Sequence, residues 1–286
     1  MKKIRIVTDS TADIPKELVE KFNLTVVPLK VHFGESTYLD GVNLSASEFY
    51  KKLEQSPLLP TTSQPSPLDF VDTFKGIHDQ EEGNVSIISI HLSSALSGTY
   101  QSANLAKNMI GNEVDVTVID SKMASYAIGI IVIAVAEAAE SGKTKEQCIL
   151  LAEQLIEETV VYFVVDTLEY LQKGGRIGKA SALFGSLLNI KPILSLDRDG
   201  EVYAIDKVRG QKKAFGRLIQ YLKEYAGDHK VRVGISHGEA YEEVEQIKEM
   251  LHQDFEISDM VITDIGPVIG THVGPKTVAV TMYKIL

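Results

Sequence analysis

The chain has 286 residues, of which 44% are hydrophobic, and its formal net charge is −10. This length is typical of two domains with sizeable cores. The negative charge argues against nucleic acid or an anionic membrane surface as a general partner. The single cysteine, Cys148, allows no internal disulfide, and the most apolar run, 127–136, is too short to span a bilayer. Because a strand pattern begins at residue 3 without a signal peptide, we expect a cytoplasmic protein without stable membrane insertion.

Strand-like and helix-like stretches alternate over the first half of the chain. Strands are predicted over 3–7, 24–31 (interrupted at Pro28), 85–90 and 114–119, and helices over 15–21, 48–55 (capped by Ser47), 68–76, 100–109, 123–140 and 144–158. Gly34 and Gly41 flank a hairpin or an irregular segment, and the prolines of 60–67 predict a rigid loop. The alternation predicts a mostly parallel sheet between helical layers, an α/β/α sandwich over residues 1–158.

The pattern changes after residue 158, where strands follow one another more often. Strands are predicted over 162–165, 191–196, 202–207, 231–236, 255–263 and 277–284, and helices over 166–171, 180–188, 214–225 and 240–252. Asp199-Gly200 is a strong hairpin signal between two of these strands. We therefore expect an α+β domain over residues 159–286, and an α/β protein of two domains overall.

Polar residues follow three of the strands predicted in the first half. The clusters are Thr8-Asp9-Ser10, Ser93-Ser94 and Asp120-Ser121. Because the carboxyl ends of parallel strands meet at one edge, we expect these clusters to line the edge where such sheets bind ligands. Ser93, Ser94 and Ser97 also precede a helix, whose first N–H groups attract anions. The alternative is that these serines only cap that helix.

Two arginines and one histidine are further candidates for binding an anion. Arg176 lies in the glycine-rich loop 172–179. This loop either binds an anion or contacts the other domain, or it is only a sharp turn at the surface. Arg209 closes a strand, and its guanidinium suits a carboxylate, although it also fits a solvated helix start. His272 lies in a loop, 266–275, rich in glycine and proline, and it either donates to an anion or is structural.

The sequence contains no convincing nucleophile–base pair and no Cys/His cluster typical of zinc. The hydroxyls, arginines and histidine singled out above are all donors to an oxyanion. This pattern favours binding over catalysis, so we expect no catalytic residues and no metal.

Several long stretches also carry a family likeness. They are IVTDSTADIP (6–15), PTTSQPSP (60–67), HLSSALSGTYQSA (91–103), VIDSK (118–122), DTLEYLQKGGRIG (166–178), IKPIL (190–194) and GPVIGTHVGP (266–275). Together, in this order and along nearly the whole chain, they resemble the DegV family of bacterial fatty-acid-binding proteins.

The resemblance implies a two-domain α/β protein that holds one long-chain fatty acid between its domains, with no further cofactor. It implies carboxylate contacts from Thr62, Ser94, Arg209 and His272. It also implies a secondary role, either at the ligand site or at the surface that meets a partner, for Ser63, Ser93, Ser97 and Arg176. The resemblance further implies a separate ATP-dependent fatty acid kinase, which makes the acyl phosphate, so the protein itself is not expected to be an enzyme.

Two alternatives stay open beside this interpretation. The first is a phosphoryl- or acyl-transfer enzyme that acts on a small anionic substrate through Ser94 or His272. The second is a lipid-responsive regulatory protein. An enzyme turns over its substrate alone, whereas a carrier does not.

Overall fold

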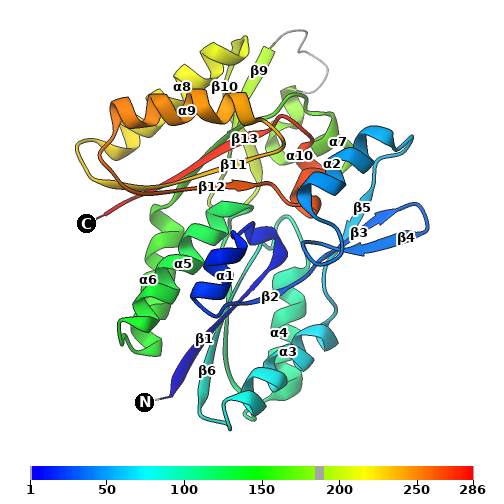
Figure 1. Cartoon of the computed structure of the whole chain (residues 1–286), viewed down its shortest axis with the longest axis vertical. Helices are drawn as coiled ribbons and strands as arrows, with labels where there is room; N and C mark the ends of the chain where they lie inside the picture. The colour runs from blue at the N-terminus through cyan, green and yellow to red at the C-terminus, as the bar shows by residue number, and fades with distance from the viewer. Residues whose placement is uncertain (1, 184–189, 286) are drawn as a thin grey trace.

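The computed structural model describes residues 2–183 and 190–285. A parallel sheet with its helices forms the lower half of Figure 1, and a mixed sheet with its helices forms the upper half. Helix α5 (Tyr126–Glu140) packs against strands of both sheets. The predicted fold class, an α/β protein with a parallel first sheet and a second sheet-rich region, is confirmed.

The first sheet has the order β2-β1-β6-β7, and all its neighbouring strands are parallel. Its strands are β1 (Lys3–Asp9), β2 (Thr25–Val27), β6 (Val85–His91) and β7 (Asp115–Asp120). Every residue of β6 is buried. Val85 and Ile87 pack in the core beside α3 (Pro67–Gln80) and α4 (Thr99–Ile110), whereas Ile88 and Ile90 join the core around α5. Because both faces are covered, apolar residues of the strand occur on both faces and not only at alternate positions.

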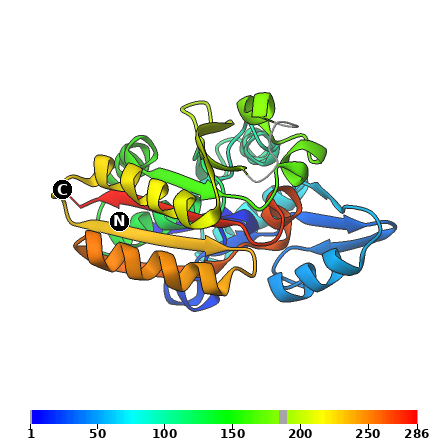
Figure 2. The same cartoon turned by 90° about the horizontal axis from the view of Figure 1, so that it is seen from above.

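The second sheet has the order β10-β9-β8-β13-β11-β12. Its strands are β8 (Val160–Val164), β9 (Ile190–Leu196), β10 (Val202–Arg209), β11 (Val231–His237), β12 (Ile257–Asp264) and β13 (Val278–Lys284). The β11–β12 pair is parallel and the other pairs are antiparallel. Helices α8 (Gln211–Ala226) and α9 (Tyr241–Asp254) cover its outer face (Figures 1 and 2).

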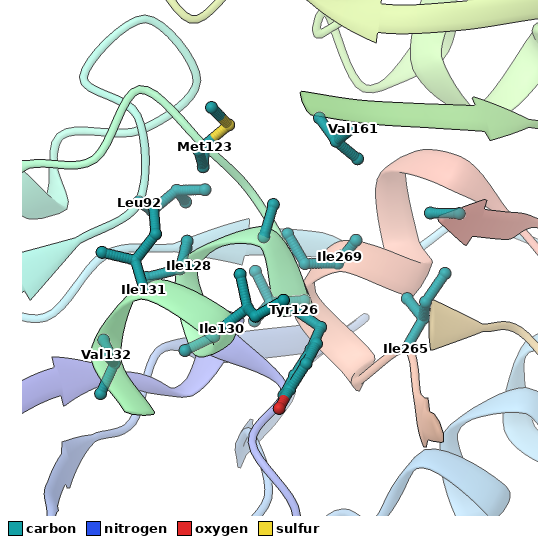
Figure 3. Packing of buried hydrophobic residues seen from close by; sticks show 14 of the residues in the cluster. Leu92, Met123, Tyr126, Ile128, Ile130, Ile131, Val132, Val161, Ile265 and Ile269 are labelled. Carbon is teal, nitrogen blue, oxygen red and sulfur yellow. The ribbon is translucent and has the colours of Figure 1, made fainter. Parts of the chain in front are cut away.

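Helix α5 fills the space between the two sheets. Its residues from Tyr126 to Ala136 are all buried, as the apolar run 127–136 predicts. Gly234 of β11 leaves room for the Tyr126 ring, since a Cβ there would lie 2.3 Å from a ring carbon. Figure 3 shows Tyr126 and its helical neighbours among Leu92, Val161 and Ile269, which come from three other segments. The core is therefore shared by both sheets.

A small antiparallel sheet, β4-β3-β5, projects from one side (Figure 2). Its strands are β3 (Lys30–Phe33), β4 (Ser36–Leu39) and β5 (Thr61–Ser63). The rigid loop predicted over 60–67 instead contains the edge strand β5, so the prediction is wrong for residues 61–63. The strand fits between Pro60 and Pro65 and pairs only with β3, so no proline has to donate to the ladder.

Two further predictions need correction. The stretch 266–275 contains helix α10 (Pro267–Val273), with Pro267 in its first turn, where proline costs no hydrogen bond. Helix α2 (Ala46–Gln55) is capped by Ser45 and not by Ser47. Ser45 and Glu48 form a reciprocal capping box, the Ser-x-x-Glu pattern that marks a helix start.

The remaining elements are short or peripheral. They are η1 (Ser10–Ala12), α1 (Lys16–Lys21), α6 (Lys145–Glu158), α7 (Glu169–Lys173) and η2 (Gly178–Leu183). The helix predicted over 180–188 begins instead as the 3-10 turn η2, and residues 184–189 lie outside the described residues. Within the described part of the chain, no helix combines the length and the apolar character needed to cross a membrane.

Candidate functional site

A cavity lies between the two sheets and contains about 860 Å³ of space, including its opening. Its wall is mostly apolar and comes from the second sheet, from α10 and from segments that follow strands of the first sheet, with Leu29, Leu92, Val161, Phe163, Leu196 and Ile269 among its side chains. Three of these, Leu92, Val161 and Ile269, are visible in Figure 3. The cavity therefore suits a largely apolar ligand.

One part of the cavity wall carries a hydrogen-bonded pair from distant parts of the sequence. Thr62 Oγ1 lies 2.8 Å from His272 Nε2, and both residues line the cavity. Thr62 is placed by the edge strand β5, and His272 by the last turn of α10. The structure thus brings together two of the four residues predicted to contact a carboxylate.

The imidazole of His272 is neutral at ordinary pH. Burial, reinforced by the charge of Arg176, lowers the pKa of His272 from 6.5 to about 4. The ring therefore provides a hydrogen-bonding group without a charge, and Arg176 is the cation that lines this part of the cavity.

Arg176 is fixed by the end of helix α7. Gly175 has φ +69°, and its N–H donates to the carbonyl of Gln172, while the N–H of Arg176 donates to the carbonyl of Leu171. These two bonds form a Schellman motif, which explains the glycine at 175. The Arg176 side chain donates from Nε to the Leu96 carbonyl at 3.1 Å and from Nη1 to the Gly174 carbonyl at 2.7 Å. The guanidinium is therefore held in the cavity wall.

The three serines of the turn after β6 have different roles. Ser97 lines the cavity, and its Oγ lies 2.9 Å from Thr99 Oγ1. Ser93 is buried and donates to the carbonyl of Gly200 at 3.0 Å. The backbone N–H of Ser94 donates to Asp120 Oδ1 at 3.1 Å. The polar clusters thus meet at one sheet edge, as predicted, but Ser93 and Ser94 lie outside the cavity lining.

The protein-family model described as “Uncharacterised protein, DegV family” matches residues 3–284 of this chain. The chain belongs to the DegV family. It is 38% identical to a DegV domain-containing protein of Caldanaerobacter subterraneus subsp. tengcongensis over 281 residues, which are 98% of each chain.

Solved structures of DegV proteins have the same fold as this chain. A structure described as fatty acid binding of a DegV family protein from Thermus thermophilus has a TM-score of 0.93, with 35% identity and complete coverage of both chains. DegV from Bacillus subtilis, described as a fatty acid binding protein, has a TM-score of 0.89, with 34% identity and complete coverage of both chains.

The fourth residue predicted to contact a carboxylate, Arg209, lies at the end of β10 in this DegV chain. Its side chain is exposed, and it is not part of the cavity lining. Ser63 of β5 lines the cavity and lies 2.9 Å from His32 Nε2. Of the eight predicted site residues, the cavity lining therefore contains Thr62, Ser63, Ser97, Arg176 and His272.

A buried Asp–His–Ser arrangement lies below the serine turn of this DegV chain. His91 Nδ1 is 2.9 Å from Asp9 Oδ2, and His91 Nε2 is 2.6 Å from Ser89 Oγ. The side chains resemble a catalytic triad in type, but all three residues have 0% exposure. Asp9 also accepts the backbone N–H of Thr11 and of Leu92. The network fixes the ends of β1 and β6, and a substrate has no access to it.

Two buried carboxyl groups that were not predicted from the sequence hold the start of α10. Asp13 accepts from the N–H of Gly266 at 3.0 Å, and Asp40 accepts from the N–H of Val268 and from Ser10 Oγ. Burial raises the pKa of Asp13 well above its usual range and that of Asp40 to about 7. The sequence position of Asp13, just past β1 at the sheet edge rich in polar residues, could have indicated that its carboxyl group lies near the site.

Gln64 and Ser125 also line the cavity and were not predicted. Gln64 follows Ser63 directly, and the Ser125 hydroxyl donates to Asp13. Among the residues that the structure describes, no group of three or more His, Cys, Asp or Glu side chains is arranged to hold a metal ion.

Proposed function

We propose that this protein binds one long-chain fatty acid in the cavity and presents its carboxyl group, in the cytoplasm, to a separate ATP-dependent fatty acid kinase. The observation that carries the proposal is an apolar cavity whose wall also holds the Thr62–His272 pair and Arg176. The descriptions of the solved DegV proteins from Thermus thermophilus and Bacillus subtilis as fatty-acid-binding support the ligand class.

The energetics of burial agree with such a ligand. Removing about fourteen methylenes of a hexadecanoyl chain from water contributes roughly 11 kcal/mol, at about 0.8 kcal/mol each, before the cost of ordering the chain. An unpaired carboxylate buried with that chain would cancel much of this gain. The ligand therefore needs several fixed donors near its head group.

We assign the head-group donors from the polar lining of the cavity. The Thr62 hydroxyl and the Arg176 guanidinium face the ligand, and His272 acts through its bond to Thr62. Ser63 and Ser97 line the same cavity and make secondary contacts. This site differs from the predicted one at Ser94 and Arg209, because neither side chain lines the cavity.

Several observations support binding over group transfer. The Ser94 side chain, like its backbone N–H, hydrogen-bonds to Asp120, and His272 is paired with Thr62 instead of with a serine nucleophile. The Asp9–His91–Ser89 network is fully buried. If the protein were a transferase, it would turn over an activated acyl or phosphoryl substrate alone, and that outcome would replace the carrier proposal.

The head-group region lies close to the surface, which supports presentation to a partner. Arg176 is half-buried, and the neighbouring Gly175 is exposed. We expect acyl phosphate to form from ATP and hexadecanoate only when this protein and a fatty acid kinase are both present. Acyl phosphate formation at an equal rate with the kinase alone would contradict the presenting role and leave lipid binding unaffected.

The binding proposal is tested by comparing hexadecanoic acid with hexadecanol in titration calorimetry. Thr62→Val removes a hydroxyl at nearly constant volume and should lower affinity for the acid roughly tenfold, with little change for the alcohol. Thr62→Ser keeps the hydroxyl and is the matched control, with affinity near that of the wild type. Equal losses for acid and alcohol would contradict the head-group assignment.

A further inference from the structure

The two glycines that follow helix α7 are required for different reasons. Gly175 has φ +69°, a backbone conformation that the Schellman motif needs at this position. Gly174 has φ −74° and ψ −8°, which any residue adopts easily. Backbone conformation therefore explains the glycine at 175 but not the one at 174.

Gly174 is explained by its contact with His272. A Cβ at position 174 would lie 2.3 Å from His272 Nδ1, 2.9 Å from the carbonyl oxygen of Tyr170 and 3.1 Å from His272 Cε1, so the contact with Nδ1 is the tightest. The imidazole therefore packs directly on the Cα of Gly174, and any larger residue would displace it. The carbonyl of the same glycine accepts the Nη1 donor of Arg176 at 2.7 Å. One residue thus positions both the imidazole and the guanidinium.

This contact decides where the imidazole carries its proton. His272 Nδ1 is buried and has no hydrogen-bond partner among the described residues. A proton on Nδ1 would be a buried donor aimed at an aliphatic carbon, which is costly. With the proton on Nε2 instead, that nitrogen donates to Thr62 Oγ1 over 2.8 Å. The hydroxyl of Thr62 is then free to donate its own proton.

We infer that His272 is held as the neutral Nε2–H tautomer, that it donates to Thr62, and that Gly174 is the positioning residue that enforces this tautomer. The inference deepens the proposed fatty-acid site and rests on it, because the Thr62 hydroxyl then donates into the cavity, toward a ligand oxygen that must accept. A carboxylate accepts this bond without rearrangement. The low pKa of His272 agrees with a neutral ring.

The tautomer is measured by nitrogen NMR of the full-length protein labelled with ¹⁵N-histidine, without ligand and with added hexadecanoate. We expect His272 to have an unprotonated Nδ1 and a protonated Nε2 at neutral pH. Gly174→Ala should change this signature and lower hexadecanoate affinity roughly tenfold to a hundredfold. A protonated Nδ1 in the wild type, or a Gly174→Ala variant with unchanged tautomer and affinity, would overturn the inference.

Gly175→Asn is the matched control. Asparagine tolerates positive φ, and a Cβ at 175 meets no atom within 4 Å, so the His272 signature should stay as in the wild type. If Gly174→Ala does not fold, the wild-type spectrum alone still decides the tautomer. If hexadecanoate fails to bind the wild type, the proposed function fails, whereas the tautomer in the ligand-free protein is still tested.

Discussion

The Ser93 hydroxyl donates to the carbonyl of Gly200 at 3.0 Å and so joins the edge of the parallel sheet to the tip of the β9–β10 hairpin. The contact is tight, since a Cβ at Gly200 would lie 2.1 Å from Ser93 Oγ. Leu196 and Val202, on either side of this tip, line the cavity. The bond therefore holds one wall of the cavity against the serine turn.

Removing this bond should speed ligand release. Ser93→Ala deletes a buried hydrogen bond worth about 1 kcal/mol, so we expect hexadecanoate to dissociate several times faster. Stopped-flow displacement of a fluorescent fatty acid measures the rate. Thr73→Ala, which removes an exposed hydroxyl on α3, is the control and should leave the rate unchanged. An unchanged rate in Ser93→Ala would show that the hairpin does not limit release.

Reducing the volume of the cavity should change its preference for chain length. Ala279 of β13 lines the cavity, and Ala279→Leu adds about three carbon atoms to its wall. We expect affinity for octadecanoate to fall at least tenfold, while dodecanoate binds nearly as before, because only a long tail needs the lost space. Calorimetry with both ligands measures the difference. Equal effects on the two acids would contradict a tail in this cavity.

The buried Asp40 should make stability depend on pH. Its folded-state pKa of about 7 lies above the ordinary 3.8, so between these values the unfolded state binds fewer protons. The contribution of Asp40 is therefore fully present below pH 4 and is lost as pH rises toward 7, by at most about 4 kcal/mol.

Asp40→Asn tests this effect, because the variant has no carboxyl group to titrate. Relative to the variant, the wild type should lose unfolding free energy steadily from pH 4 to pH 7, as measured by urea denaturation. Asp72→Asn, an exposed position on α3, is the control for removing a carboxylate. A difference between the wild type and Asp40→Asn that does not vary with pH would show that Asp40 is charged in the folded protein throughout.

The buried Asp9–His91 pair should contribute to stability and not to ligand chemistry. Asp9 accepts bonds from His91, Leu92 and Thr11, so Asp9→Asn turns an acceptor into a donor facing other donors. We expect a loss of about 3 kcal/mol in unfolding free energy, by analogy with broken buried pairs. Hexadecanoate affinity below the melting temperature should be unchanged. A stable variant that no longer binds the ligand would contradict this assignment.

The sequence predicted the parallel sheet because its signals are local. The β-branched run of β6, buried on both faces, and the polar residues just beyond β1, β6 and β7 are visible without tertiary information. Helix α10 was missed because glycine and proline dominate 266–275. Its Gly270 is explained by close contact with Phe49 and Tyr50 of α2, which a sequence does not display.

The position of Arg209 could not be predicted for a similar reason. Side chains alternate along a strand, but the β9–β10 pairing shifts register between Ala204 and Asp206. Beyond the shift, Arg209 pairs with Ile190 and so lies on the same face of the sheet as Val202, which pairs with Leu196 and lines the cavity. Arg209 nevertheless lies at the exposed end of β10, outside the cavity lining. The partnership of Thr62 with His272, which are 210 residues apart, likewise follows only from the packing of β5 beside α10.

The central claim is that the cavity holds one fatty acid. Native mass spectrometry of the purified protein, combined with mass spectrometry of its organic extract, tests it most directly. We predict one fatty acid per chain in both measurements. An empty extract, with added hexadecanoate neither binding nor raising the melting temperature, would contradict the account.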